Sequence, residues 1–390
     1  MKTLSKLFRT VGQVLLLVVL SGLLGAACGW FMLQYELFDS LDTLQGPERI
    51  AVLLWFVAAF GLTYFLEIAL HEAGHLLCGL WSGYRFVSYR LGSVLWMKEN
   101  GRIVRKRFSL AGTGGQCLME PPGDPGGEFP QVFYNMGGVL MNLVTGLLFL
   151  AVLLLPSARR SLFCLPLLVF GTLSAFISAI FNGVPLAVGP VPNDGWNALH
   201  LLRDREARRA FWVMLTVNAR QYEGIRLKEM PSDWFTLPSR EAMKNGLTAT
   251  LAVLAENRAM DQLDFSAAET LFPVLQDKTC RIADLYKRLL VCDIVCCALL
   301  REGAAADISP LSERQTAAVL KQMRDYPSVL RTRYAVALLH DGNEAEAAKI
   351  LDRFEKTACQ YPAKADIASE RELIALVKKR FSAHNFDNGT

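Results

Sequence analysis

The chain has 390 residues, and its 41 Lys and Arg against 37 Asp and Glu give a formal net charge of +4. A charge this small, without a Lys/Arg-rich tract interleaved with aromatic residues, argues against a nucleic-acid-binding protein. Hydrophobic residues make up 52% of the chain, and they gather in its first half. The composition therefore predicts two parts, a membrane-embedded domain over residues 1–200 and a cytosolic helical domain over 201–390.

Four apolar stretches in the first half predict transmembrane helices, because each exceeds the roughly 20 residues needed to cross the hydrocarbon core. The basic residues before the first stretch resemble those of a signal peptide. We expect a retained helix because the stretch is longer than a signal's apolar region and another span follows soon after; a cleaved signal is the alternative. The predicted spans are residues 11–33, 50–80, 132–155 and 162–184.

The loop charges predict the orientation of these spans. The N-terminal tail and the loop that follows the second span are basic, whereas residues 36–48 are acidic. Positive loops remain on the cytosolic side, so both termini are expected in the cytosol. Arg159 and Arg160 oppose this assignment, but they lie next to helix ends, where long cationic side chains can reach the interface.

The pentapeptide His71-Glu72-Ala73-Gly74-His75 follows the apolar part of the second predicted span. Two histidines four residues apart on a helix face the same way, so both can bind one Zn²⁺. Glu72 between them can act as general base toward water. Such a string also arises by chance, but ionisable groups in a membrane are costly and therefore usually functional.

A catalytic zinc site usually has three protein ligands, and Asp194 is the best third candidate. It follows a segment interrupted by Pro and Gly, in which a membrane helix must break. A broken helix at membrane depth is tolerated where it is buried in protein or lines a watery cavity. Taken alone, Asn193-Asp194-Gly195 is better interpreted as an ordinary turn beyond a helix end, and only the upstream H-E-x-x-H motif favours Asp194 as a ligand.

With these motifs the chain resembles the site-2 protease family of intramembrane zinc metalloproteases. The family pairs H-E-x-x-H with a later N-x-x-P and D-G element, and it implies Glu72 as catalytic base and His71, His75 and Asp194 as zinc ligands. The segment from Pro185 to Asp194 is longer than in the family pattern, and no PDZ-like domain is evident. The matching residues are His71–His75, Gly137–Asn142, Asn182–Pro185 and Asp194-Gly195.

The resemblance implies a multi-pass protein of a bacterial cell membrane that cleaves a membrane protein or a small membrane peptide. Asn142 and Asn182 are candidates to stabilise a developing oxyanion, although each could instead make a helix–helix hydrogen bond. Glu67 lies one turn before His71. It could hydrogen-bond a ligand histidine or be a buried structural acid, and its role is left open.

The loop over residues 84–118 predicts a β-hairpin. Two β-prone runs, residues 86–97 and 102–110, flank Asn100-Gly101, which is a strong hairpin signal. The cations of the loop could hold the hairpin on anionic lipid headgroups. Alternatively, its edge strand could pair with an unwound substrate. Gly112, Gly114, Gly115 and the stretch from Pro121 to Gly127 are expected to form a flexible link after it.

The second half predicts an all-α domain of tetratricopeptide-like repeats. Residues 333–351 read as a helix, a Gly turn and a second Ala-rich helix, and residues 251–269 are a weaker copy. Stacked helix pairs offer a groove for a protein partner, and an irregular helical bundle is the alternative.

Three functions compete at this point. The first is an intramembrane zinc endopeptidase, which the Asp194-Gly195 element favours. The second is a membrane-anchored zincin whose third ligand is a glutamate beyond residue 200 and which cleaves exposed loops. The third is a non-enzymatic membrane scaffold that uses the helical-repeat half.

Overall fold

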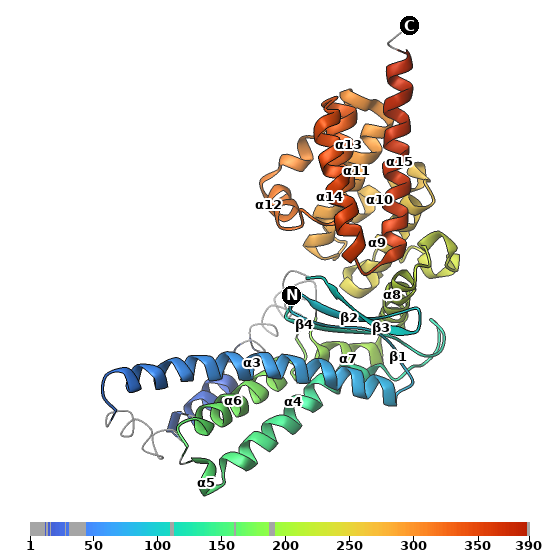
Figure 1. Ribbon diagram of the computed structural model, residues 1–390. Helices are drawn as coiled ribbons and strands as arrows, with labels where there is room; N and C mark the ends of the chain where they lie inside the picture. Colours follow the sequence, from blue (N-terminus) through green and yellow to red (C-terminus); the bar gives the residue numbers. More distant parts are fainter. Residues whose placement is uncertain are drawn as a thin grey trace. The chain divides into compact units, whose positions relative to one another are not determined.

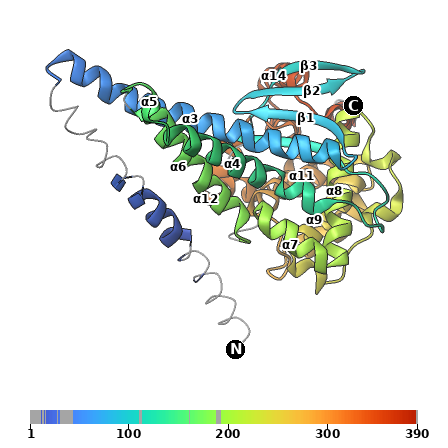
Figure 2. The same ribbon diagram turned by 90° about the horizontal axis from the view of Figure 1, so that it is seen from below.

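Three apolar helices, α3 (Pro47–Trp81), α4 (Gln131–Leu153) and α6 (Cys164–Gly183), lie side by side in the computed structural model (Figure 1, Figure 2). The structure describes residues 44–109, 113–159, 161–186 and 192–387, and parts of 12–30. Within them, these three helices are long and apolar enough to cross a membrane. They confirm the second, third and fourth predicted spans as such helices.

The first predicted span, residues 11–33, falls partly outside the described residues. Its described core, Leu17–Ala27, is an apolar helix of fewer than 18 residues. Large apolar side chains lie exposed on the three long helices, as expected of surfaces that face lipid and not water. They include Leu54, Val57, Phe65, Leu147, Leu148 and Phe181.

The chain forms two compact units, and each unit consists of three separate segments of the sequence. The first unit comprises Met1–Gly92, Ala111–Pro122 and Phe129–Asp204. The second comprises Ser93–Leu110, Gly123–Glu128 and Arg205–Thr390. Two pieces from the middle of the first half therefore belong to the unit that the C-terminal half builds.

Two antiparallel strands support the helices of the first unit, β1 (Arg85–Leu91) and β4 (Gly115–Glu120). The predicted β-run over residues 86–97 was wrong as one strand, because the chain turns at Gly92, where φ is +54°. A side chain at that φ is strained, so glycine suits the turn. Gly115, which was expected in the flexible link, is instead the first residue of β4.

The hairpin predicted at Asn100-Gly101 is confirmed, and it belongs to the second unit. Strands β2 (Val94–Glu99) and β3 (Arg102–Arg107) pair in antiparallel register around it. Asn100 and Gly101 both have positive φ, 50° and 77°, as a two-residue type I′ turn requires.

Contacts with the C-terminal helices hold this hairpin in the second unit. Glu99 forms an ion pair with Lys364, and the Arg107 N–H donates to Gln360 Oε1 over 3.3 Å. The Phe108 ring packs edge-on against Tyr361, with ring centroids 5.6 Å apart. The hairpin is therefore attached to the C-terminal helices of this unit by these contacts.

The rest of the second unit is helical. Predicted helix pairs appear as α9 with α10 and as α13 with α14. A five-residue π-helix, Val336–His340, interrupts the second pair. A regular tetratricopeptide repeat therefore stays a prediction. The helices are α8 (Arg205–Glu223), α9 (Gly246–Asp261), α10 (Phe265–Gln276), α11 (Asp284–Glu302), α12 (Arg314–Gln322), α13 (Pro327–Ala335), α14 (Glu344–Gln360) and α15 (Lys364–Asp387).

Candidate metal centre

Three side chains of the first unit converge from two helices. His71 and His75 lie on α3, and Asp194 is the first residue of α7 (Asp194–Arg203). The two histidine Nε2 atoms are 3.2 Å apart, and they lie 3.1 and 3.4 Å from Asp194 Oδ2. Ligands at tetrahedral Zn²⁺ bond lengths would be separated by roughly 3.3 Å. The three atoms therefore have the spacing of one face of a tetrahedral metal site.

Hydrogen bonds on the far side of each ring fix which histidine nitrogen is free. His75 Nδ1 lies 2.9 Å from the Tyr134 carbonyl oxygen, which can only accept, so Nδ1 carries the proton. His71 Nδ1 lies 2.7 Å from Asn142 Oδ1 and donates to it in the same way. In the neutral form of each ring, Nε2 is therefore the atom with a lone pair, and it faces Asp194. This is the arrangement that metal-bound histidines usually have.

Asn142 links His71 to a buried acid on the same helix. The Asn142 amide nitrogen donates to Glu67 Oε2 over 2.8 Å, and the Thr145 hydroxyl donates to the same oxygen over 3.0 Å. Glu67 is 1% exposed. Glu67 thus holds the Asn142 amide in place, and Asn142 in turn orients the His71 ring. The oxyanion role predicted for Asn142 would require it to leave one of these contacts.

Asn182 does not join this network, because its side-chain amide donates to the Ser178 carbonyl within α6 over 3.1 Å. Its predicted role toward an oxyanion therefore stays a prediction. Asn193, which was expected to be a turn residue, instead makes hydrogen bonds that join two helix ends.

Asn193 holds Asp194 in place at the break between α6 and α7. Helix α6 ends where Val184 turns extended before Pro185, a position at which helical backbone is disfavoured. The Asn193 Oδ1 accepts from the Trp196 N–H over 3.0 Å, and its Nδ2 donates to the Val184 carbonyl over 2.7 Å. One side chain therefore caps α7 and ties it to the end of α6.

Close packing also fixes Asp194 and shifts its titration. A Cβ at Gly195 would lie 2.1 Å from the Gly183 carbonyl oxygen, so only glycine fits next to Asp194. In the absence of a metal, burial works against ionisation of Asp194, but positive charge on protonated His75 and His71 outweighs it and holds the pKa of Asp194 below the usual value. This shift favours the ionised carboxylate, the form in which an aspartate binds a metal.

Glu72 lies against β4 of the first unit. A Cβ at Gly115 would lie 2.6 Å from Glu72 Cγ, and the Cys117 backbone hydrogen-bonds the Glu72 carboxylate. The Tyr134 hydroxyl donates to the Cys117 carbonyl over 2.9 Å. Burial, together with the charge of Glu72, raises the pKa of Tyr89 on β1 to about 12. Strand β4 therefore positions the carboxylate beside the three converging side chains.

Glycines bring α3 and α4 close enough to build this centre. A Cβ at Gly74 would lie 2.2 Å from the Gly137 carbonyl oxygen, so the two helix backbones touch. A Cβ at Gly138 would lie 2.4 Å from the His71 ring. The glycine-rich face noted in the sequence thus provides space for a ligand histidine.

Gly138→Ala is expected to displace the His71 imidazole and to weaken metal binding by roughly 10–100-fold, as loss of orienting contacts does elsewhere. Equilibrium dialysis against a zinc buffer measures this. Gly61→Ala on α3 is the matched control, because a Cβ there has no atom within 4 Å. Equal zinc affinity of Gly138→Ala and the unchanged protein would contradict the role given to this glycine.

Within the part of the chain that the structure describes, His71, His75 and Asp194 are the group that could hold a metal ion. No described glutamate beyond residue 200 joins them, so the geometry does not favour the zincin alternative. No known family identifies the chain. Neither a protein-family model nor a curated protein nor a solved structure matches it.

Proposed function

We propose that this protein is an intramembrane zinc metalloendopeptidase that resembles the site-2 protease family. The observation that carries the proposal is the triangle of His71, His75 and Asp194 atoms, 3.1–3.4 Å apart, with Glu72 next to it in sequence. Two nitrogens and one carboxylate oxygen suit Zn²⁺ and leave a fourth position open.

The position of the motif on α3 supports cleavage at or near the membrane. Residues 50–70 would form a helix about 30 Å long, which matches the hydrocarbon thickness of a bilayer. His71 follows directly, so its side chain lies at the edge of that apolar segment. Water can reach such a depth from one side while a substrate segment enters from the lipid.

A Zn²⁺ ion held by the three ligands would supply Lewis acidity, which activates water and polarises a peptide carbonyl. Glu72 would take a proton from the attacking water and deliver it to the leaving amine nitrogen. Asn142 and the Tyr134 carbonyl would keep the two imidazoles aligned throughout, because each holds one Nδ1–H. Strand β4 would limit the movement of the Glu72 carboxylate through Cys117.

The substrate class in this proposal is a single transmembrane segment or a small membrane peptide. Both termini of the protein are proposed to lie in the cytosol, in a bacterial cell membrane, and the helical second unit is proposed to bind a protein partner. The scaffold alternative has no specific observation in its favour, since a scaffold needs no converging ligand set.

Reconstituted protein tests the proposal. The full chain in lipid vesicles is incubated with single-span peptides that carry helix-breaking residues at varied depth. Cleavage should require zinc, stop with a chelator and return when zinc is added back. Helix-breaking residues should speed cleavage, because the peptide bond must leave its helix before attack. Chelator-insensitive cleavage, or zinc binding with no cleavage of any such peptide, would remove the support for this function.

A further inference from the structure

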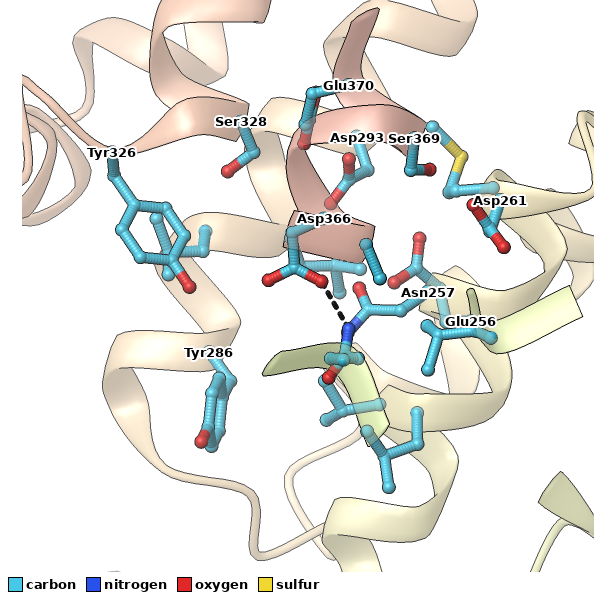
Figure 3. A pocket seen from close by; sticks show the side chains of 18 of the residues that line it. Glu256, Asn257, Asp261, Tyr286, Asp293, Tyr326, Ser328, Asp366, Ser369 and Glu370 are labelled. Carbon is cyan, nitrogen blue, oxygen red and sulfur yellow. Dashed lines mark hydrogen bonds between the residues drawn. The ribbon is translucent and has the colours of Figure 1, made fainter. Parts of the chain in front are cut away.

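A polar cavity of about 210 Å³ lies within the second unit, far along the chain from the metal centre. Helices α8, α9, α11, α13 and α15 contribute to its wall. Five carboxylate side chains line it against one guanidinium, that of Arg331 (Figure 3). The five acids are Glu256, Asp261, Asp293, Asp366 and Glu370.

Three of these acids already have a cation. Arg331, which is 1% exposed, forms ion pairs with Asp293 and with Glu370 at 2.9 Å. Asp261 pairs with Arg226 at 2.6 Å. Among the described residues, no cation forms an ion pair with Glu256 or Asp366. The cavity therefore has more carboxyl groups than cations to pair with them, and burial and then the nearby Asp293 raise the pKa of Glu256 well above its usual value.

Glu256 is the decisive side chain. It is 1% exposed, and its Oε1 has no hydrogen-bond partner. Its carboxylate lies among those of Asp293, Asp366 and Glu370 in Figure 3. A buried carboxylate that lacks a partner costs the folded state free energy. Such a group is expected where a ligand supplies the missing partner.

Asp366 is the second acid without a cation. It accepts a hydrogen bond from the Gln221 side chain. Burial first, and then the neighbouring Glu370 and Asp261, raise its pKa to about 7. A positive charge in the cavity would relieve this repulsion.

The other residues that line the cavity favour an organic cation over a metal ion. The described residues bring three potential metal-ligand groups together only at His71, His75 and Asp194, so the cavity carboxylates form no preassembled metal site. Apolar side chains of Leu254, Met260, Leu290 and Leu373 line the cavity beside the acids, and Tyr286 and Tyr326 add two aromatic rings. The hydrocarbon part of an organic cation would pack against the apolar side chains, and its charged group can lie on the face of an aromatic ring. The volume is below the roughly 300–1,000 Å³ of drug-sized pockets.

We propose that this cavity binds an aliphatic cation, a protonated amine or a guanidinium on a hydrocarbon stem, with Glu256 and Asp366 as its counter-charges. The source is either a free small amine or a Lys or Arg side chain of a bound peptide. The proposal is independent of the metal centre and does not require peptidase activity.

Calorimetry on the full chain in detergent tests the proposal. Agmatine and cadaverine are the free probes, and a short capped peptide with a central lysine is the peptide probe. We expect one site per chain, and about tenfold or greater loss of affinity in Glu256→Gln, because a charged hydrogen bond is lost. Tighter binding of the peptide than of both amines assigns the site to a peptide partner, and the reverse assigns it to a free amine.

Asp352→Asn on α14 is the matched control, since this acid is exposed and pairs only locally with Lys356. Its affinity for the probes should equal that of the unchanged chain. Absence of binding to every probe, equal weakening in Asp352→Asn, or preferential binding of Mg²⁺ or Ca²⁺ alone would overturn the proposal.

The pH dependence supplies a second measurement in case Glu256→Gln folds poorly. Affinity for agmatine should rise between pH 5.5 and 8, because ionisation of Asp366 near pH 7 adds a counter-charge. Asp366→Asn should flatten this rise. An unchanged pH profile in that variant would contradict the role of Asp366. The ionisable side chains that surround it are Glu256, Asp261, Asp293, Tyr286, Tyr326, Arg331, Tyr361 and Glu370.

The melting temperature of the protein provides an independent test of the pKa shift of Asp366. Folding raises the pKa of Asp366 from 3.8 to about 7. The ionisation of Asp366 therefore lowers the free energy of unfolding once the pH exceeds about 3.8. Asp366→Asn should therefore melt at the same temperature as the unchanged chain near pH 4 and at a higher temperature at pH 8. Saturating agmatine should reduce the difference at pH 8.

Discussion

Glu72→Gln is expected to retain one zinc per chain and to lose peptide-bond hydrolysis by at least about 10²–10⁴-fold. General-base catalysis typically accounts for a factor of that size, and glutamine cannot accept the proton. The amide has nearly the same shape, so its contact with Gly115 and the Cys117 backbone should persist. Cleavage of a reconstituted single-span peptide and metal analysis of the same sample measure both quantities.

Glu48→Gln is the control for this substitution. Glu48 is exposed in the first turn of the same helix, α3. It should leave both zinc content and cleavage unchanged. If Glu72→Gln cleaves at a rate comparable with the unchanged chain, Glu72 is not the base and the assignment fails.

Asp194→Ala is expected to lose roughly 100-fold or more in zinc affinity, since even residues that only orient ligands cost 10–100-fold. Metal content after dialysis should fall from near one zinc per chain to near zero. The matched control is Asp204→Ala, at the opposite end of α7, where the acid pairs with His200 at 3.3 Å. Full zinc content in Asp194→Ala would show that a different residue completes the site.

The helices that carry the site could be predicted because their sequence signal is strong. Long apolar runs identify α3, α4 and α6, and the spacing of His71 and His75 places both on one face of α3. Asp194 could be nominated only because the helix must break near Pro185. Its distance from the histidines depends on how α6 and α7 pack, and no local pattern encodes that.

The contacts that orient the site could not be predicted. Tyr134 contributes through its backbone carbonyl, and any residue has one, so its identity carries no signal. Asn193 was expected to be a turn residue. Its hydrogen bonds to the end of α6 and the start of α7 exist only once both helices have folded, so no local pattern reveals them. Gly138 was visible as part of a glycine-rich face, but the His71 ring that needs its space is far away in sequence.

The C-terminal cavity was missed for a similar reason. Its acids come from helices α9, α11 and α15, and each acid alone resembles an ordinary solvated charge. Only burial distinguishes Glu256 from the many exposed acids of this half. When most faces of a helix are buried, the periodicity of its apolar residues does not show which polar residue is buried with them.

The β2–β3 hairpin has a consequence for synthesis of the chain. Its partner Gln360 lies 253 residues after Arg107. At 5–20 residues per second, the hairpin leaves the ribosome roughly 10–50 s before the helices that receive it. Strand β3 is an edge strand, and during that interval it lacks its contact with Gln360 and could pair with another nascent chain. Its four cations, Arg102, Arg105, Lys106 and Arg107, discourage such pairing, as charged edge strands do in other proteins.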